Sequence, residues 1–437
     1  MQIILIYGVQ KIGIQNKNKN THNRAYFFFK KILESGIIVA IIPRDMIKRF
    51  LIFLMGLNVG AVCAADFQTN AKSAYLIDYD SGTAIVSKNA DALMPPSSML
   101  KLMTLTVLFD EIKSGKLKMD DTLTVSDNAD YKNPQWYPAS KMCLVPNQKI
   151  TVRDAVLGII VLSAGDASVV VAEHLAGSEN KFTELMQNKA REIGMEKSTF
   201  GNASGLPHDN NLMTSRELAI LAKYIIDEYP ELYPMFATRR FEFNDTKTDW
   251  CREWTRSHTL NYNKLLFQMN GADGLKTGHT DDGGYGVVAS SKIGGRRLIG
   301  VINGFRGRGH DGLAEEMKKL LNYGYKTTQT KVFYKRGDVL LKIPVWYGRY
   351  DTVEATVSEN VAITLPKDAT LKNIRVMARF EEPIAAPIKA GQRIGEVVIE
   401  KNGDIVKRVP LVAKDKVRKI QFLGRVFKNI SVMIWGK

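Results

Sequence analysis

Residues 95–104 read PPSSMLKLMT, and this stretch decides how the whole chain is interpreted. The two prolines break whatever element precedes them, and a helix is predicted over 98–114, where Gly115 closes it. Ser98 and Lys101 fall in its first turn, three positions apart, so their Cβ atoms are expected about 5–6 Å from each other. A helix N-terminus also favours negative charge that develops beside it.

This pairing of a serine with a lysine suits nucleophilic catalysis. A serine hydroxyl is a poor nucleophile unless a base takes its proton. A partly buried lysine can lose its own proton and act as that base. The same spacing also arises by chance at the start of an ordinary surface helix, so Ser98 and Lys101 need support from the rest of the chain.

Two further segments place polar residues at positions where a functional role would explain them. Lys276-Thr277-Gly278 is predicted on a strand. There the lysine offers a charge for a carboxylate, the threonine a hydroxyl, and the glycine a bare edge for an extended peptide. Ser163 interrupts two apolar helical segments, one capped by Thr151 and one that Asp166 is expected to cap. Each segment has a functional and a plain structural interpretation. Lys276 could simply lie on a basic edge strand. Ser163 could relay a proton, or it could simply lie in a helix–helix turn.

The rest of the pattern predicts an α+β domain over 66–330 and a small all-β, sandwich-like domain over 331–415. A hairpin is expected over 74–86, and helices over 215–227 and 311–325. After residue 331, short Val/Ile/Thr runs alternate with turn residues, which is typical of a β domain.

Composition limits the class of protein. A chain of 437 residues with 45% hydrophobic content is long enough for two or three globular domains. Its formal net charge of +16 comes with no basic-aromatic motif, so an anionic lipid or wall polymer is expected as a partner and nucleic acid is not. No clustered His/Cys spacing indicates a metal, and no cofactor is expected. Cys143 and Cys251 could pair in an oxidising compartment, but the sequence leaves this open.

Residues 46–65 have the organisation of a secretory signal peptide, with a basic start, an apolar run and small residues at its end. Cleavage is expected after Ala64 or Ala65. The alternative is an uncleaved membrane anchor, for which the apolar run is short. Because a signal peptide begins a chain, Met46 is predicted to be the true start and 1–45 an over-extended, non-structural start. An internal signal is the competing explanation.

Residues 416–437, KVRKIQFLGRVFKNISVMIWGK, predict a basic amphipathic helix. Apolar residues such as Ile420, Phe427 and Ile434 recur at helical spacing, with basic residues mostly off that face. Such a helix can lie in a membrane interface. The alternative is a C-terminal helix packed on the β domain.

Three segments together resemble the signature blocks of penicillin-binding D-alanyl-D-alanine carboxypeptidases, which are penicillin-recognising serine enzymes. In order they are 95–104, LSAGDASVVVAEH at 162–174 and GADGLKTGHTDDGGYGVVAS at 271–290. The flanking LIDYDSG and STFGNASGLP resemble the family as well, over about 70–415. The resemblance implies a β-lactamase/transpeptidase-like catalytic domain, an antiparallel sheet with a helical cluster. It also implies a periplasmic enzyme at the inner membrane that acts on peptidoglycan stems ending in D-Ala-D-Ala and binds β-lactams.

Carried over, the resemblance implies catalytic roles for Ser98 as nucleophile, Lys101 as its base and Ser163 as proton relay. The residues it implies for substrate binding are Lys276, Thr277, Gly278, His279 and Arg216. The backbone N–H groups of Ser98 and His279 would form the oxyanion hole, while the His279 side chain would only hold position.

One departure stands out. The family reads Ser-x-Asn where this chain reads Ser163-Ala164-Gly165, so an amide that holds substrate is missing. We therefore expect Gly165→Asn to raise penicillin acylation modestly, by roughly threefold to tenfold for one neutral hydrogen bond. A serine β-lactamase is the alternative enzyme, but the loop 202–211 lacks the glutamate that such an enzyme uses for deacylation. A non-catalytic wall-binding protein is the alternative outside the enzymes.

Overall fold

The computed structural model describes residues 2–7, 67–137 and 139–421. The chain divides into two compact units, one of residues 61–328 and one that combines 1–60 with 329–437. The division lies within a few residues of the predicted domain boundary at 330. Each unit is described by itself.

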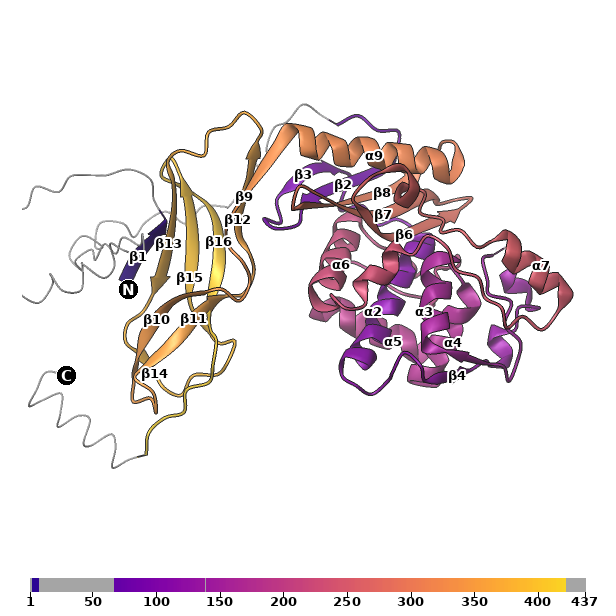
Figure 1. Cartoon of the computed structure of the whole chain (residues 1–437), viewed down its shortest axis with the longest axis horizontal. Helices are drawn as coiled ribbons and strands as arrows, with labels where there is room; N and C mark the ends of the chain where they lie inside the picture. Colours follow the sequence, from indigo (N-terminus) through magenta and orange to yellow (C-terminus); the bar gives the residue numbers. More distant parts are fainter. Residues whose placement is uncertain (1, 8–66, 138, 422–437) are drawn as a thin grey trace, which may run out of the picture. The chain divides into compact units, whose positions relative to one another are not determined.

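An antiparallel five-stranded sheet organises the first unit, with the strand order β3-β2-β8-β7-β6 (Figure 1). Its strands are β2 (Ser73–Asp78), β3 (Ala84–Lys88), β6 (Ala272–Thr280), β7 (Gly284–Ile293) and β8 (Arg296–Phe305). The predicted hairpin over 74–86 is confirmed as β2 and β3. Among the described strands, β6 lies at the edge of this sheet, so one side of its backbone has no strand neighbour.

Helices cover both faces of the sheet. One face carries α9 (Gly309–Thr327), which contacts β7 and β8, and the other carries α6 (Ser215–Glu228) and the rest of a helical cluster (Figure 1). The cluster also contains α2 (Lys101–Lys113), α3 (Val152–Val161), α4 (Gly165–Ala176) and α5 (Glu179–Glu192), and the shorter α7 (Asp249–Ser257) and α8 (Leu265–Gln268) lie in the same unit. This is the α+β arrangement expected from the sequence.

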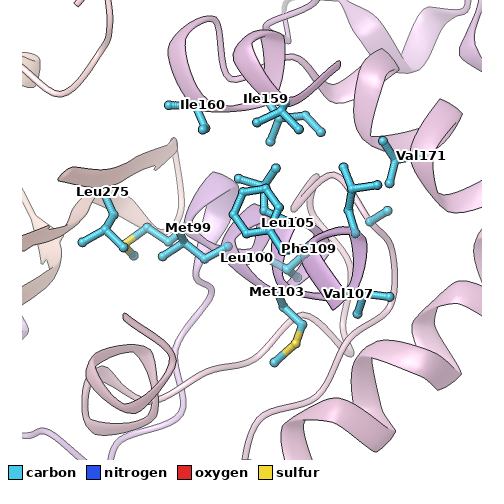
Figure 2. Packing of buried hydrophobic residues seen from close by; sticks show 14 of the residues in the cluster. Met99, Leu100, Met103, Leu105, Val107, Phe109, Ile159, Ile160, Val171 and Leu275 are labelled. Carbon is cyan, nitrogen blue, oxygen red and sulfur yellow. The ribbon is translucent and has the colours of Figure 1, made fainter. Parts of the chain in front are cut away.

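The helix α2 runs through the middle of the apolar core. Met99, Leu105 and Phe109 pack against side chains of α3, α4 and β6 (Figure 2). Every residue from Lys101 to Phe109 is buried. Burial on all sides explains why this helix shows only a weak apolar stripe in the sequence, and it places the lysine at its N-terminus inside the protein.

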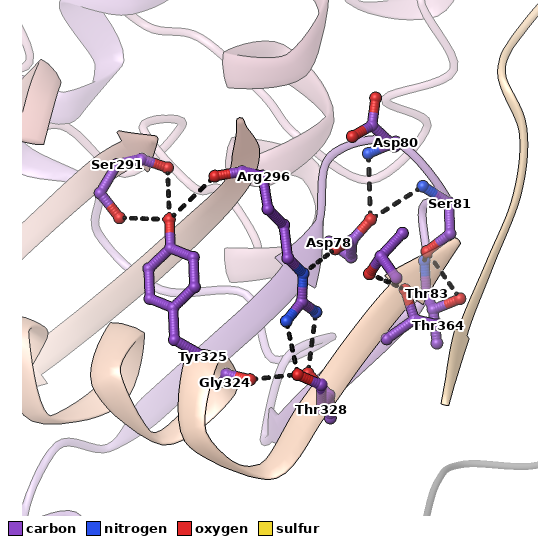
Figure 3. A network of polar contacts seen from close by, with 11 residues as sticks. Asp78, Asp80, Ser81, Thr83, Ser291, Arg296, Gly324, Tyr325, Thr328 and Thr364 are labelled. Atoms are coloured by element: carbon purple, nitrogen blue, oxygen red, sulfur yellow. Dashed lines mark hydrogen bonds and ion pairs between the residues drawn. The ribbon is translucent and has the colours of Figure 1, made fainter. Parts of the chain in front are cut away.

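A buried ion pair joins the sheet to the end of α9. Arg296 donates to Asp78 at 2.8 Å and to the carbonyl and hydroxyl oxygens of Thr328 at 2.7 and 2.8 Å (Figure 3). Tyr325 donates to the carbonyl oxygen of Ser291 at 2.8 Å in the same network. A buried carboxylate needs such partners, since an unpaired charge in the interior is costly.

The second unit is all-β, as predicted. Its seven-stranded sheet has the order β1-β13-β15-β16-β11-β10-β14, and a two-stranded sheet pairs β12 with β9. The strands are β1 (Gln2–Tyr7), β9 (Thr328–Tyr334), β10 (Val339–Trp346), β11 (Thr352–Val357), β12 (Val361–Pro366), β13 (Ile374–Phe380), β14 (Ile384–Ala385), β15 (Arg393–Lys401) and β16 (Asp404–Ala413). Buried aliphatic side chains of these strands form their own core.

The two ends of the chain bear on three predictions. β1 falls within the segment 1–45 and pairs antiparallel with β13, while the start at Met46 stays a prediction. The tail helix does not begin at 416, because Val417 and Lys419 instead form isolated bridges with two other segments of the β domain. The predicted signal peptide, 46–65, and residues 422–437 of the predicted tail helix lie outside the described residues. No described helix is long and apolar enough to cross a membrane.

Candidate active site

The nucleophile candidate stands at the entrance to α2. A short 3-10 turn, Ser97–Leu100, leads into the helix, and Lys101 is the first α-helical residue. The Lys101 ammonium donates to the Ser98 hydroxyl at 2.9 Å and also to the carbonyl oxygen of Ser204. The predicted i,i+3 contact between Ser98 and Lys101 is therefore present.

Burial changes the chemistry of Lys101. Its side chain is only 2% exposed, and desolvation lowers the pKa of Lys101 to about 7, although the negative charge of Asp166 acts in the opposite direction. Desolvation lowers a lysine pKa because it penalises the charged form. The neutral amine, which a base requires, is consequently available near neutral pH.

A second pair of the same kind faces the first. Lys276 on β6 is 1% exposed and donates to the Ser163 hydroxyl at 2.9 Å. Burial, together with repulsion from the charge of Lys101, holds the pKa of Lys276 well below its usual range. Ser163 itself adopts a left-handed backbone conformation with φ of 57° between α3 and α4, a conformation that residues adopt where the surrounding structure demands it.

A cavity of about 510 Å³ brings the three sequence blocks together. Its lining contains six of the eight predicted site residues, together with Gly165: they are Ser98, Lys101, Ser163, Thr277, Gly278 and His279. Lys276 reaches the same place through its bond to Ser163. The loop 205–207 supplies another wall.

Gly278 explains how β6 approaches the nucleophile. A Cβ atom at this position would lie 2.7 Å from the carbonyl oxygen of Pro96 and 2.9 Å from the backbone nitrogen of Ser98. Such contacts are too short for any side chain. The His279 side chain is exposed and stacks on Tyr285, with ring centroids 3.9 Å apart, in line with a positional role.

Arg216 is not part of the cavity wall. It donates two bonds to Asp91, at 2.8 and 2.7 Å, and one to the hydroxyl of Tyr75 at 2.8 Å. The structure therefore places the Arg216 guanidinium on a carboxylate of the protein itself and outside the cavity wall, while its role in substrate binding stays a prediction.

Asp166 is also different from its prediction. Ala164, not Asp166, is the N-cap of α4. The Asp166 carboxylate is fully buried and accepts hydrogen bonds from the backbone N–H groups of Met142, Leu144 and Ala167. Burial raises the pKa of Asp166, whereas these donors lower it. The carboxylate thus holds a loop beside the cavity, and the disulfide between Cys143 and Cys251 ties the same loop to α7.

Sequence reasoning missed several lining residues, among them Trp136, Tyr262 and His310. His310 lies in the first turn of α9 against the Tyr285 and Tyr262 rings, with centroids 5.2 Å apart in both cases. Burial, followed by the charge of Lys276, lowers the pKa of His310 to about 4, so the imidazole is neutral at physiological pH. No local pattern in the sequence predicts these contacts.

The described residues hold no group of three or more His, Cys, Asp or Glu placed to bind a metal ion. What the cavity offers is two serine–lysine pairs beside an unpaired strand edge.

Residues 60–306 match the D-alanyl-D-alanine carboxypeptidase family of peptidases. The chain belongs to this family. Residues 329–419 match the C-terminal domain of penicillin-binding protein 5.

Relatives within the D-alanyl-D-alanine carboxypeptidase family cover nearly the whole described chain. The D-alanyl-D-alanine carboxypeptidase DacF of Bacillus subtilis is 31% identical over 84% of this chain and 90% of its own length. The structure of penicillin binding protein 5 from Haemophilus influenzae matches with a TM-score of 0.68 and 30% identity, over 82% of this chain and all of the other. Penicillin-binding protein D2 from Listeria monocytogenes, solved in its cefotaxime-bound form, matches with a TM-score of 0.52 and 25% identity over 60% of this chain and all of the other.

Proposed function

We propose that this protein is a serine D-alanyl-D-alanine carboxypeptidase that removes the terminal D-alanine of peptidoglycan stem peptides through an acyl-enzyme on Ser98. The observation that carries the proposal is the pair of lysine-to-serine bonds, Lys101 to Ser98 and Lys276 to Ser163, both 2.9 Å long at one cavity. The first pair supplies an activated nucleophile, and the second supplies a polarised hydroxyl for the leaving group.

Acylation begins with a neutral Lys101. Its amine takes the hydroxyl proton as Ser98 Oγ attacks the carbonyl carbon between the two D-alanines. The backbone N–H groups of Ser98 and His279 stabilise the resulting oxyanion. Collapse of this intermediate breaks the peptide bond. Ser163 gives its proton to the departing amine and takes one from the Lys101 ammonium at the same cavity, so Lys101 is neutral again while the Ser98 ester remains.

The substrate lies along β6. This strand is at the edge of the described sheet, so an extended peptide can add to it through backbone hydrogen bonds. The terminal carboxylate at the end of that peptide binds beside Lys276 and the hydroxyl of Thr277, and its negative charge favours the protonated form of the buried Lys276. Water then attacks the ester, with Lys101 again available as the base, and releases the shortened stem.

A β-lactam resembles this substrate and acylates the same serine. The serine β-lactamase alternative needs a residue that removes the acyl group efficiently. Glu179 is the carboxylate bonded to the 202–211 loop, through the backbone N–H of Ala203 at 2.8 Å, but it does not line the cavity. Long-lived acylation is therefore expected, as in a carboxypeptidase.

Location follows from the substrate. The signal peptide 46–65 would export the chain to the periplasmic side of the inner membrane, and the amphipathic residues 422–437 would hold it there at the membrane surface. Peptidoglycan stems are found on that side. This membrane attachment is part of the proposal and has its own test in the Discussion.

Release of D-alanine from diacetyl-Lys-D-Ala-D-Ala tests the activity directly. Wild type is expected to release it and to form a stable adduct with fluorescent penicillin, and Ser98→Ala to do neither while keeping its thermal stability. Ser97→Ala, the adjacent serine, is the matched control and should keep both activities. A penicillin ester found by mass spectrometry on Ser97 or Ser163 would show that Ser98 is not the nucleophile, and rapid loss of the adduct would indicate a β-lactamase.

A further inference from the structure

The third position of the Ser163 motif is filled in an unusual way. Gly165 is the first residue of α4, and its φ lies outside the left-handed region, so the backbone does not require glycine. A Cβ atom built there would nevertheless lie 2.4 Å from Cζ3, 3.1 Å from Cε3 and 3.3 Å from Cη2 of the Trp136 indole. The benzo edge of Trp136 therefore occupies the space into which a side chain at position 165 would extend.

The indole is held in this place. Trp136 is 1% exposed and belongs to the main apolar core of its unit. Its carbonyl oxygen accepts a hydrogen bond from Lys141 at 2.5 Å, and the backbone N–H of Gly165 donates to the carbonyl oxygen of Ser140 at 2.9 Å. The Asp166 carboxylate accepts hydrogen bonds from the backbone N–H groups of Met142 and Leu144, which fixes the same loop. Because the indole is almost fully buried, it cannot swing away cheaply to admit a larger residue.

Trp136 and Gly165 both line the cavity, as do Ser98 and the β6 residues Thr277 and Gly278. A peptide that pairs with β6 through one of its edges leaves its other edge for the remaining walls. We propose that Trp136 is a specificity-determining residue. Its indole occupies the space of the missing amide at position 165 and gives the second edge of the bound peptide an apolar contact. This inference rests on the proposed function of the cavity.

The absence of an amide at position 165 should change which β-lactams react fastest, because only those with a hydrogen-bonding group on the edge away from β6 could bind such an amide. An asparagine could donate to, and accept from, the acylamido group of a penicillin, and a neutral bond of this kind changes a rate by roughly threefold to tenfold. The benzo edge of the Trp136 indole, which faces position 165, has no hydrogen-bonding atom and cannot do so. Wild type should therefore distinguish benzylpenicillin, which has an acylamido group, only weakly from 6-aminopenicillanic acid, which has none.

The contact with Trp136 reverses the sequence-based expectation that Gly165→Asn alone speeds acylation. The added side chain meets a buried ring, so either the ring or the first turn of α4, beside Ser163, must move. We expect this single variant to acylate at least tenfold more slowly than wild type and to melt at a lower temperature. Removing the ring as well should restore room for the amide.

A double-mutant cycle tests this pairing in the full chain, using wild type, Gly165→Asn, Trp136→Ala and the double variant. The measured quantities are the second-order acylation rates with benzylpenicillin and with 6-aminopenicillanic acid, and the melting temperature. The double variant is expected to acylate faster than Gly165→Asn, and its preference for benzylpenicillin should exceed that of Trp136→Ala by roughly threefold to tenfold. Trp250→Ala, which removes a half-exposed tryptophan that does not line the cavity, is the control and should not rescue Gly165→Asn.

Two outcomes would overturn the inference: a Gly165→Asn variant with wild-type rate and stability, or a double variant with no gain in preference over Trp136→Ala. If Trp136→Ala does not fold, the milder exchange of Trp136→Phe with Gly165→Ala serves in the same cycle, and absence of rescue there counts equally against it. Failure of wild type to label at Ser98 would instead refute the proposed function itself.

Discussion

The buried base Lys101 predicts a specific pH dependence of acylation. Only the neutral amine can take the proton of Ser98, and the pKa of Lys101 is lowered to about 7 by burial. As the pH rises through 7 the lysine loses its proton, so the rate should rise and level off above about pH 8. Below the pKa the neutral fraction falls tenfold per pH unit, and the rate at pH 5 should be about one hundredth of the plateau.

Substitution of Asp166 should shift the pH dependence of the acylation rate. Its carboxylate raises the pKa of Lys101, against the larger effect of burial. Asp166→Asn removes the charge but keeps an oxygen that can accept from the backbone N–H of Met142. The pKa of Lys101 should then fall, and the acid limb of the profile should move to lower pH. Asp154→Asn, at the start of α3 and outside the cavity wall, is the matched control and should leave the profile in place.

Stopped-flow acylation with a fluorescent penicillin between pH 5 and pH 9 measures the profile, with a melting curve at each pH to exclude unfolding. An inflection close to the value of an exposed lysine, or a rate independent of pH, would refute the assignment of Lys101 as a base with a lowered pKa. A shift to higher pH in Asp166→Asn would show that the charge of Asp166 does not act on this lysine in the way described.

Three further predictions concern the rest of the chain. The native protein should start translation at Met46 and begin, once processed, at Ala65 or Asp66, and N-terminal sequencing that finds any earlier residue contradicts this. Deleting residues 422–437 should release an active enzyme from membranes, so a truncated protein that still sediments with them refutes the anchor. Cys143→Ser should lower the free energy of unfolding by roughly 2–5 kcal/mol, because it opens a disulfide spanning 108 residues, and denaturant unfolding without reductant checks this.

Local features of the sequence predicted the elements that frame the site. Thr151 caps α3 as expected, by accepting from the backbone N–H of Asp154. Gly177 ends α4 in the left-handed conformation that glycine favours. These signals are reliable because a cap, a turn or an i,i+3 contact such as that of Ser98 with Lys101 depends only on residues close together in the chain. The order of the three blocks then indicated the family and, through it, six of the residues that line the cavity.

Predictions that depended on distant partners were wrong or missing. Asp166 has the residue type and place of a helix cap, but its partners Met142 and Leu144 lie in another loop. Arg216 was expected at a substrate carboxylate, and the structure shows it paired with Asp91. In both cases the charged side chain binds a group of the protein that is distant in the sequence, and no local pattern specifies the position of that group.

The sequence by itself determined the family and the chemistry that we propose, because the proposed nucleophile, its proposed base and the proposed substrate-binding strand are encoded in short motifs with fixed local geometry. Only the tertiary structure decided how that chemistry is tuned. The pKa of Lys101 depends on how completely the fold removes it from water. The meaning of Gly165 depends on Trp136, which lies 29 residues earlier in the chain and reaches the same space only after folding. Desolvation and steric exclusion are properties of the packed interior, and a linear pattern does not specify which atoms meet there.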